Sequence, residues 1–241
     1  MPLAGGQYMR ELLWGLALAF FFIEIIPVLI FGFSYIPGVI SIRDMIDIFV
    51  YPPIMGYLFY MIYNEVFREY NGLVSPLYFL AVVLHFEGHG FHWAANALNV
   101  MMEHAGISGV VLKYAFLLDE IISHKMMFHA FIVILLIILY MATKYRIGES
   151  ENALKYMFPA GILFGFSLSA AMVEGQSPYE LIITCIIILL IITLTPYGGF
   201  SRVKRNDVLV FLFSMALFSL VLAGAYYAIF KGFPQPSEIL G

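Results

Sequence analysis

The stretch of the chain with the most concentrated chemistry is HFEGHGFHWAAN, which holds three histidines, a glutamate and an asparagine within twelve residues. Successive residues of an α-helix are rotated by about 100°, so His85, His89, His92 and Asn96 project within about 60° of one another. Glu87 projects roughly the opposite way. The spacing therefore predicts one helix face lined by imidazoles.

Two glycines, Gly88 and Gly90, lie between these histidines. A residue without a side chain lets a neighbouring helix approach closely. We therefore expect another backbone to pack beside the histidine face.

A second polar set lies in the stretch LLDEIISHKMMFH. Glu120 and His124 are four residues apart and share a helix face, with Asp119 and Ser123 on its flank. Asn96 of the first set and Ser123 of this one could hold a developing oxyanion.

The short connection HAGISG makes the two helices that carry these sets antiparallel neighbours. Counted from its middle, near residue 106, His92 lies 14 residues back and Glu120 lies 14 forward. His89 and His124 pair in the same way, at 17 and 18 residues. The two sets should therefore meet at one depth.

Buried ionisable groups are costly unless they pair or bind a metal, and imidazole with carboxylate is a common donor set for zinc or iron. The expected ligands are His89, His92 and His124, and Glu120 or Asp119 is the acid ligand or the general base. His85 is a further ligand or an orienter of one. Glu174, at the end of a later helix on the same side, is added to the ligand set. The competing interpretation is a hydrogen-bonded polar seam between helices.

The composition indicates the elements that must position these residues. The chain of 241 residues is 62% hydrophobic and 12% charged, and its mean hydropathy is +0.92. Apolar runs are long enough to cross about 30 Å of hydrocarbon as helices. We expect an all-α polytopic membrane bundle, a single integral membrane domain over residues 1–241, with seven transmembrane helices at about 11–33, 46–64, 74–102, 111–143, 154–174, 179–196 and 207–230.

The cysteine and charge content of the chain exclude a disulfide-stabilised fold and nucleic-acid binding, and the charge distribution indicates an orientation in the membrane. Cys185 is the only cysteine, so no disulfide framework forms within one chain. Nucleic-acid binding needs a basic surface that this chain lacks. With seven spans, eight Lys and Arg residues lie on the amino-terminal side and three on the other. The positive-inside rule then places the amino terminus in the cytoplasm and the carboxyl terminus outside, with the plasma membrane as the expected location.

Seven spans with a histidine and carboxylate centre resemble the superfamily of alkaline ceramidases and adiponectin receptors, and HFEGH has the His-x-x-x-His spacing found there. That family places its paired histidines on the last helix, whereas residues 207–230 contain none. The likeness therefore covers architecture and ligand chemistry, and implies a zinc-dependent lipid hydrolase.

We accordingly expect a metalloenzyme with zinc, or alternatively iron, that hydrolyses an amide or ester bond of a membrane lipid entering from the outer leaflet. A di-iron oxidase or desaturase, an ion or metal transporter, and a subunit of an oligomer or membrane complex remain alternatives. The roles of Glu24 and Glu87 stay open.

Overall fold

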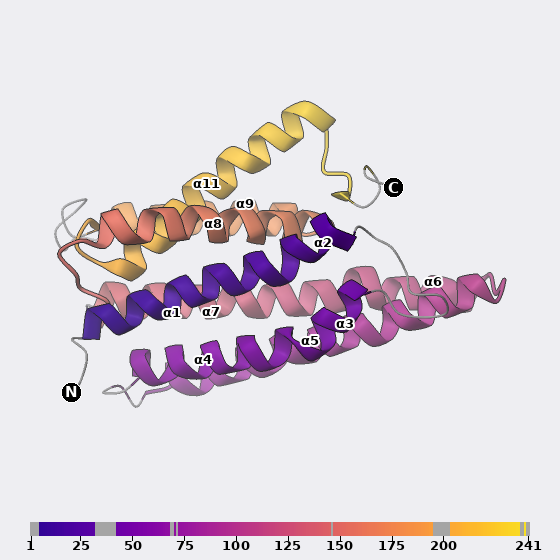
Figure 1. Ribbon diagram of the computed structural model, residues 1–241, viewed down its shortest axis with the longest axis horizontal. Helices are drawn as coiled ribbons and strands as arrows, with labels where there is room; N and C mark the ends of the chain where they lie inside the picture. Colours follow the sequence, from indigo (N-terminus) through magenta and orange to yellow (C-terminus); the bar gives the residue numbers. More distant parts are fainter. Residues whose placement is uncertain are drawn as a thin grey trace.

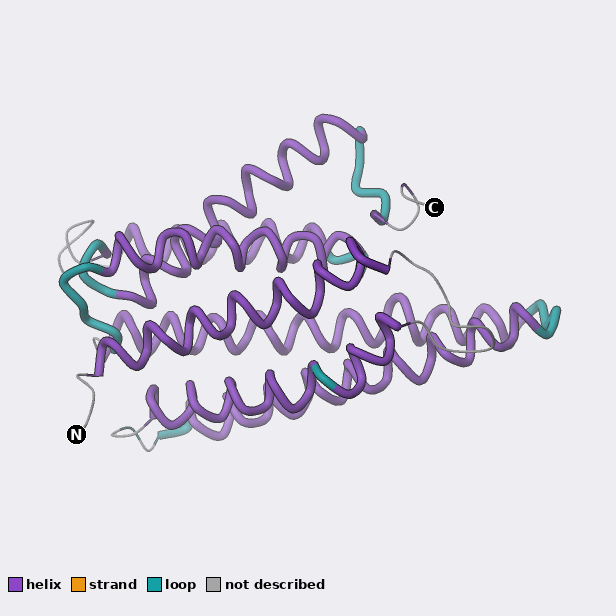
Figure 2. Tube along the Cα trace, in the orientation of Figure 1, coloured by secondary structure: helices purple, strands orange, loops and turns teal. Residues whose placement is uncertain are grey.

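The computed structural model describes residues 5–31, 42–67, 70, 72–145, 147–194, 203–236 and 239. These residues form helices (Figures 1 and 2). They include one isolated β-bridge, between Glu149 and Asn206, and no β-strand. The expected all-α bundle is confirmed. Its helices are α1 (Gly5–Phe20), η1 (Phe21–Ile25), α2 (Ile26–Phe31), α3 (Ile42–Phe49), α4 (Tyr51–Phe67), α5 (Val74–His104), α6 (Val110–Phe116), η2 (Leu117–Ser123), α7 (His124–Tyr145), α8 (Ala153–Glu174), α9 (Pro178–Leu194) and α11 (Asp207–Phe230).

Several of these elements are continuous, so the described helices form long rods. Five of them are both long and apolar enough to cross a membrane: Gln7–Ile30, Met45–Phe67, Val110–Tyr145, Ala153–Glu174 and Asp207–Phe230. The apolar α9 is shorter, at 17 residues. Helix α5 lies outside this set and carries the histidine-rich stretch, which makes one of its faces polar.

Helices α8 and α11 pack closely through two glycines of α8. A Cβ atom at Gly161 would overlap the Ser214 side chain and the Phe211 carbonyl, and one at Gly165 would lie 2.8 Å from the Met215 carbonyl oxygen. The missing side chains therefore let the two backbones touch, as small residues do between membrane helices.

A polar network ties the helices together at the end of the bundle where the chain begins (Figure 1). Arg10 Nε lies 3.3 Å from the buried Asp207 carboxylate, and the guanidinium also donates to Ser150. Asn206 caps α11 by accepting from the Leu209 N–H, and its own amide donates to the Ile147 carbonyl at 2.8 Å. These bonds connect α1, the loop before α8 and the start of α11.

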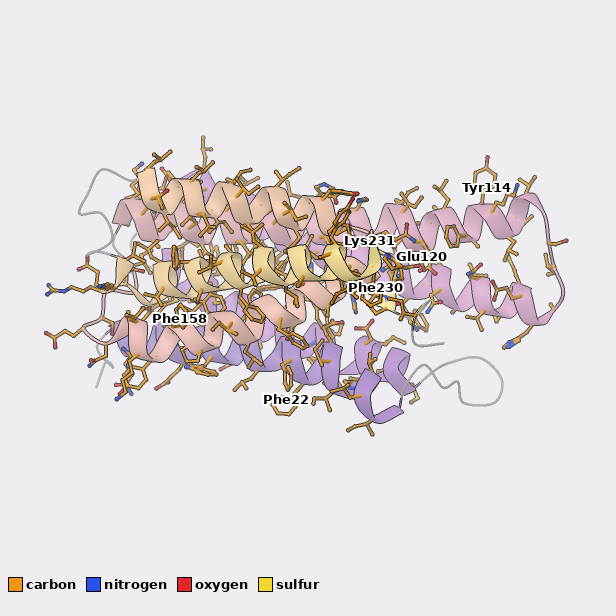
Figure 3. All side chains as sticks on the ribbon, turned by 90° about the horizontal axis from the view of Figure 1, so that it is seen from above. Phe22, Tyr114, Glu120, Phe158, Phe230 and Lys231 are labelled. Atoms are coloured by element: carbon orange, nitrogen blue, oxygen red, sulfur yellow. The ribbon has the colours of Figure 1, made fainter. Side chains whose placement is uncertain are left out.

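At the opposite end, α5 and the rod of α6, η2 and α7 form an antiparallel hairpin that extends beyond the other helices (Figures 1 and 3). The 31 residues of α5 would span about 46 Å at about 1.5 Å per residue. A Cβ at Gly88 would lie 2.7 Å from the Met127 nitrogen, so the expected close approach occurs there. It does not occur at Gly90, which is exposed and has no atom within 4 Å of the position of a Cβ, because it faces away from α7.

Candidate functional site: a histidine-lined cavity

The polar residues of α5 and α7 surround a cavity of about 50 Å³ that η1, α3, α4 and α8 also help to enclose. Four histidines and three carboxylates contribute to its wall, and no lysine or arginine is among the described residues that line it. Its polar side chains are Glu24, Asp47, Tyr51, His85, His89, His92, His124 and Glu174.

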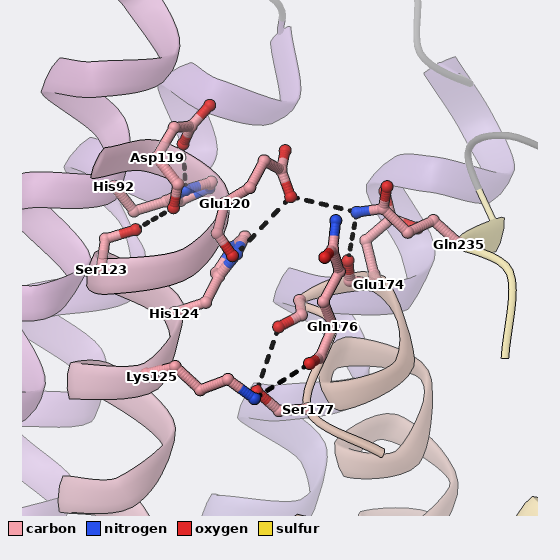
Figure 4. Close-up of polar contacts among 11 residues, drawn as sticks. His92, Asp119, Glu120, Ser123, His124, Lys125, Glu174, Gln176, Ser177 and Gln235 are labelled. Carbon is pink, nitrogen blue, oxygen red and sulfur yellow. Dashed lines mark hydrogen bonds and ion pairs between the residues drawn. The ribbon is translucent and has the colours of Figure 1, made fainter. Parts of the chain in front are cut away.

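His92 is held by a carboxylate on the neighbouring helix. Its Nδ1 lies 2.7 Å from Asp119 Oδ1, and Asp119 is 2% exposed (Figure 4). The contact is an ion-pair distance and lacks the geometry of a hydrogen bond, so it leaves the tautomer of the ring open. The His92 ring also lies against His124, with 4.3 Å between the ring centroids.

His124 is oriented by the turn that precedes it. Its Nδ1 lies 3.1 Å from the Glu120 carbonyl oxygen, which can only accept, so Nδ1 carries the hydrogen. The Glu120 carboxylate lies 3.8 Å from the same nitrogen. The lone pair of the neutral His124 ring is then on Nε2.

His89 is oriented from a third element. Its Nε2 donates to the Asp47 carbonyl at 3.1 Å and lies 3.4 Å from the Asp47 carboxylate, and its ring stacks on Tyr51 at 4.5 Å between centroids. The lone pair of the neutral ring is on Nδ1. Asp47 and Tyr51 were missed by the sequence analysis, because their position on α3 and α4 beside α5 is set by the tertiary packing.

Both ring nitrogens of His85 are engaged. Nδ1 donates to the Met127 carbonyl at 3.1 Å, and Nε2 accepts from the Tyr51 hydroxyl at 2.8 Å. Its two bonds join α5 to α4 and to α7.

Three of the acidic residues at or behind the cavity come from π-helical turns. Glu24 lies in η1, while Asp119, Glu120 and Ser123 lie in η2. A π-helical turn inserts a residue and so rotates the side chains around it; such turns are frequent at functional sites. The expected facing of His92 and Glu120 assumed a regular α-helix, and in the structure it is Asp119 that reaches His92.

The remaining expected residues are placed as follows. Asp119 and Glu120 lie behind the imidazoles and are not part of the cavity wall. The Ser123 hydroxyl is buried and donates to the Asp119 carbonyl, and Asn96 is half-buried and also outside the wall. Glu174 lines the cavity as expected, and Glu87 is exposed and away from it.

The cavity therefore has the donor chemistry of a metal site without a preformed ligand shell. Among the residues that the structure describes, no three His, Cys, Asp or Glu side chains are close enough together to hold a metal ion as they stand.

Comparison of the chain with protein-family models, curated proteins and solved structures finds no match in any of the three.

Proposed function

We propose that the protein is an integral membrane metalloenzyme that binds zinc through His89, His92 and His124 and hydrolyses an amide or ester bond of a membrane lipid. The observation that supports this proposal most strongly is the position of the three rings and the oxygen atoms next to them. Each lines the same cavity and has one ring nitrogen close to a protein oxygen. Histidines that bind metals characteristically donate their other ring N–H to a carbonyl or a carboxylate in this way.

The three imidazole rings provide nitrogen ligands of the kind that zinc binds. The rings must move a short distance before they can bind one ion together. Because the three rings are not yet gathered, binding requires them to close around the ion. A single water needs about 10–15 Å³ of such space, so the cavity of about 50 Å³ leaves room for an ion and one or two waters.

A zinc ion bound by three imidazoles supplies Lewis-acid chemistry and lowers the pKa of water towards neutrality. The chain itself would supply orientation and proton transfer. Asp119 and the Glu120 carbonyl hold the rings of His92 and His124. The carboxylates that line the cavity are the residues placed to accept a proton, so we assign the general base to Glu174 or Glu24 in preference to Glu120 or Asp119.

A lipid is the proposed substrate because the cavity is small and lies among apolar helices. In this proposal the amide or ester group reaches the cavity edge beside the ion, while the acyl chains stay against the exposed apolar helix faces. We further propose that the amino terminus is cytoplasmic and that the cavity opens towards the outer leaflet of the plasma membrane, following the distribution of Lys and Arg.

The decisive experiment is elemental analysis of the full chain purified without chelators. The expected result is about one zinc per chain, as in catalytic sites with three protein ligands. If the folded protein retains neither zinc nor iron and takes up neither ion on titration, every enzymatic proposal made here is overturned.

A di-iron oxidase is the second candidate, and one observation favours it. Glu24, Asp47 and Glu174 line the same cavity as the histidines, and di-iron bundles combine carboxylates and histidines from facing helices. The same elemental analysis separates the two functions, because this candidate requires about two irons per chain.

A further inference from the structure

The chain that follows α11 turns back over the bundle, and residues 231–236 are called the C-terminal strap below. Lys231 has a φ of +58°, which ends the helix, and its N–H bonds to the Tyr227 carbonyl at 2.8 Å. The Tyr226 hydroxyl then donates to the Pro234 carbonyl at 2.7 Å. The ring of Phe233 lies 5.6 Å from that of Tyr179 on α9. The strap is thus anchored on α11 and α9.

Gln235 connects the strap to residues at the edge of the histidine cavity. Its amide nitrogen donates to Glu120 Oε2 at 3.1 Å and to the Glu174 carbonyl at 2.6 Å (Figure 4). Glu120 is the residue beside His124, and Glu174 lines the cavity. One side chain therefore joins η2 to the end of α8 at the edge of the cavity.

A second link crosses the same edge of the cavity, about one turn after Glu120 in the chain. Lys125 bonds to the carboxylate of Glu180 and to the Gln176 carbonyl, which holds α7 against the turn between α8 and α9. This link is an ion pair within the bundle. The Gln235 link comes from a neutral amide on the chain that follows the last helix, and such bonds exchange readily with water.

We propose that the C-terminal strap closes the entrance to the histidine cavity between η2 and the end of α8, with Gln235 as its latch. Release of Gln235 separates Glu120 from Glu174 and opens the cavity at this edge. The closing action depends on neither the metal nor the reaction proposed above, so it can be tested apart from them.

The test measures access to the cavity from water. Ala171 lines the cavity one turn before Glu174, and the only native cysteine, Cys185, is fully buried. An Ala171→Cys probe in a Cys185→Ser background is reacted with a trimethylammonium-ethyl methanethiosulfonate, with Gln235 intact or changed to Ala or Glu. Gln235→Glu keeps the shape, loses the donor and places a carboxylate beside Glu120.

Both Gln235 changes should raise the modification rate of the probe roughly tenfold, which corresponds to about 1.4 kcal/mol. Tyr226→Phe, which loses only the bond to Pro234, should raise it less. A Glu103→Cys probe at the exposed end of α5 serves as the control, and its rate should not change.

Equal rates at Ala171→Cys in all backgrounds overturn the proposal. A variant in which the control cysteine or the thermal midpoint also changes has lost its fold, and Tyr226→Phe then decides the question alone.

Discussion

His92 on α5 and Asp119 on η2 face each other with 2.7 Å between Nδ1 and Oδ1, and Asp119 is buried. A carboxylate this close to an imidazole helps to hold the orientation of the ring. The contact also joins the two helices that carry most of the candidate site. The packing of the hairpin therefore helps to set the position of His92, a proposed zinc ligand.

Asp119→Asn should weaken zinc binding by about 10- to 100-fold, the usual effect of losing such a partner. The amide keeps the shape of the side chain and removes its charge. Competition with a chromogenic chelator measures the affinity. Glu87→Gln, which neutralises an exposed carboxylate on the far face of α5, is the matched control and should bind zinc as the unchanged protein does. Equal affinities for the two variants would show that Asp119 does not support a ligand.

The histidines should separate into two classes on substitution. His124→Gln removes a ring whose Nδ1 is bound to a carbonyl and whose Nε2 is the proposed donor, so zinc should be lost. His85→Gln removes a ring with both nitrogens engaged by Tyr51 and Met127, so zinc content should persist while stability falls. Metal content per folded chain distinguishes them, and loss of zinc in both variants would restore His85 as a ligand.

Glu174→Gln should lower lipid hydrolysis by roughly 10²- to 10⁴-fold with zinc retained, the usual contribution of a general base. Glu24→Gln identifies the base if Glu174 is not essential, because both carboxylates line the cavity. Release of fatty acid from a panel of amide- and ester-linked lipids is the measurement. If Glu120→Gln alone abolishes turnover, the base lies behind the rings, where it was first expected. Ion flux through reconstituted protein that depends on these residues would favour transport.

Gly161→Ala should destabilise the bundle by about 1–3 kcal/mol, because the new methyl group overlaps the Phe211 carbonyl of α11. Gly224→Ala is the matched change in α11 itself. No atom lies within 4 Å of its new Cβ, so it should be neutral or stabilising by up to about 1 kcal/mol. Thermal unfolding in detergent, followed by circular dichroism, compares the two. Similar midpoints would mean that α8 and α11 can separate at little cost.

Cysteines placed at Ile107 and Lys204 test the proposed orientation in intact cells. A membrane-impermeant maleimide should label Ile107→Cys, in the turn between α5 and α6, and should spare Lys204→Cys until the cells are opened. The reverse pattern would place the cavity on the cytoplasmic side, and labelling of both from outside would exclude the expected arrangement of spans.

The amino-acid sequence by itself determined the helical class, the rods and the pairing of the two polar sets. Long apolar runs permit few structures other than helices, and a short connection between two of them leaves little choice but an antiparallel hairpin. That is why the turn predicted near residue 106 lies between α5 and α6, and why His92 meets an acidic residue of η2.

Only the tertiary structure decided which acidic residue meets which ring and what else reaches the cavity. A π-helical turn depends on the packing around it, and here it brings Asp119 rather than Glu120 to His92. Asp47, Tyr51 and Gln235 come from segments far from the histidines in the chain. Their positions depend on how whole helices pack, which no local spacing of residues records.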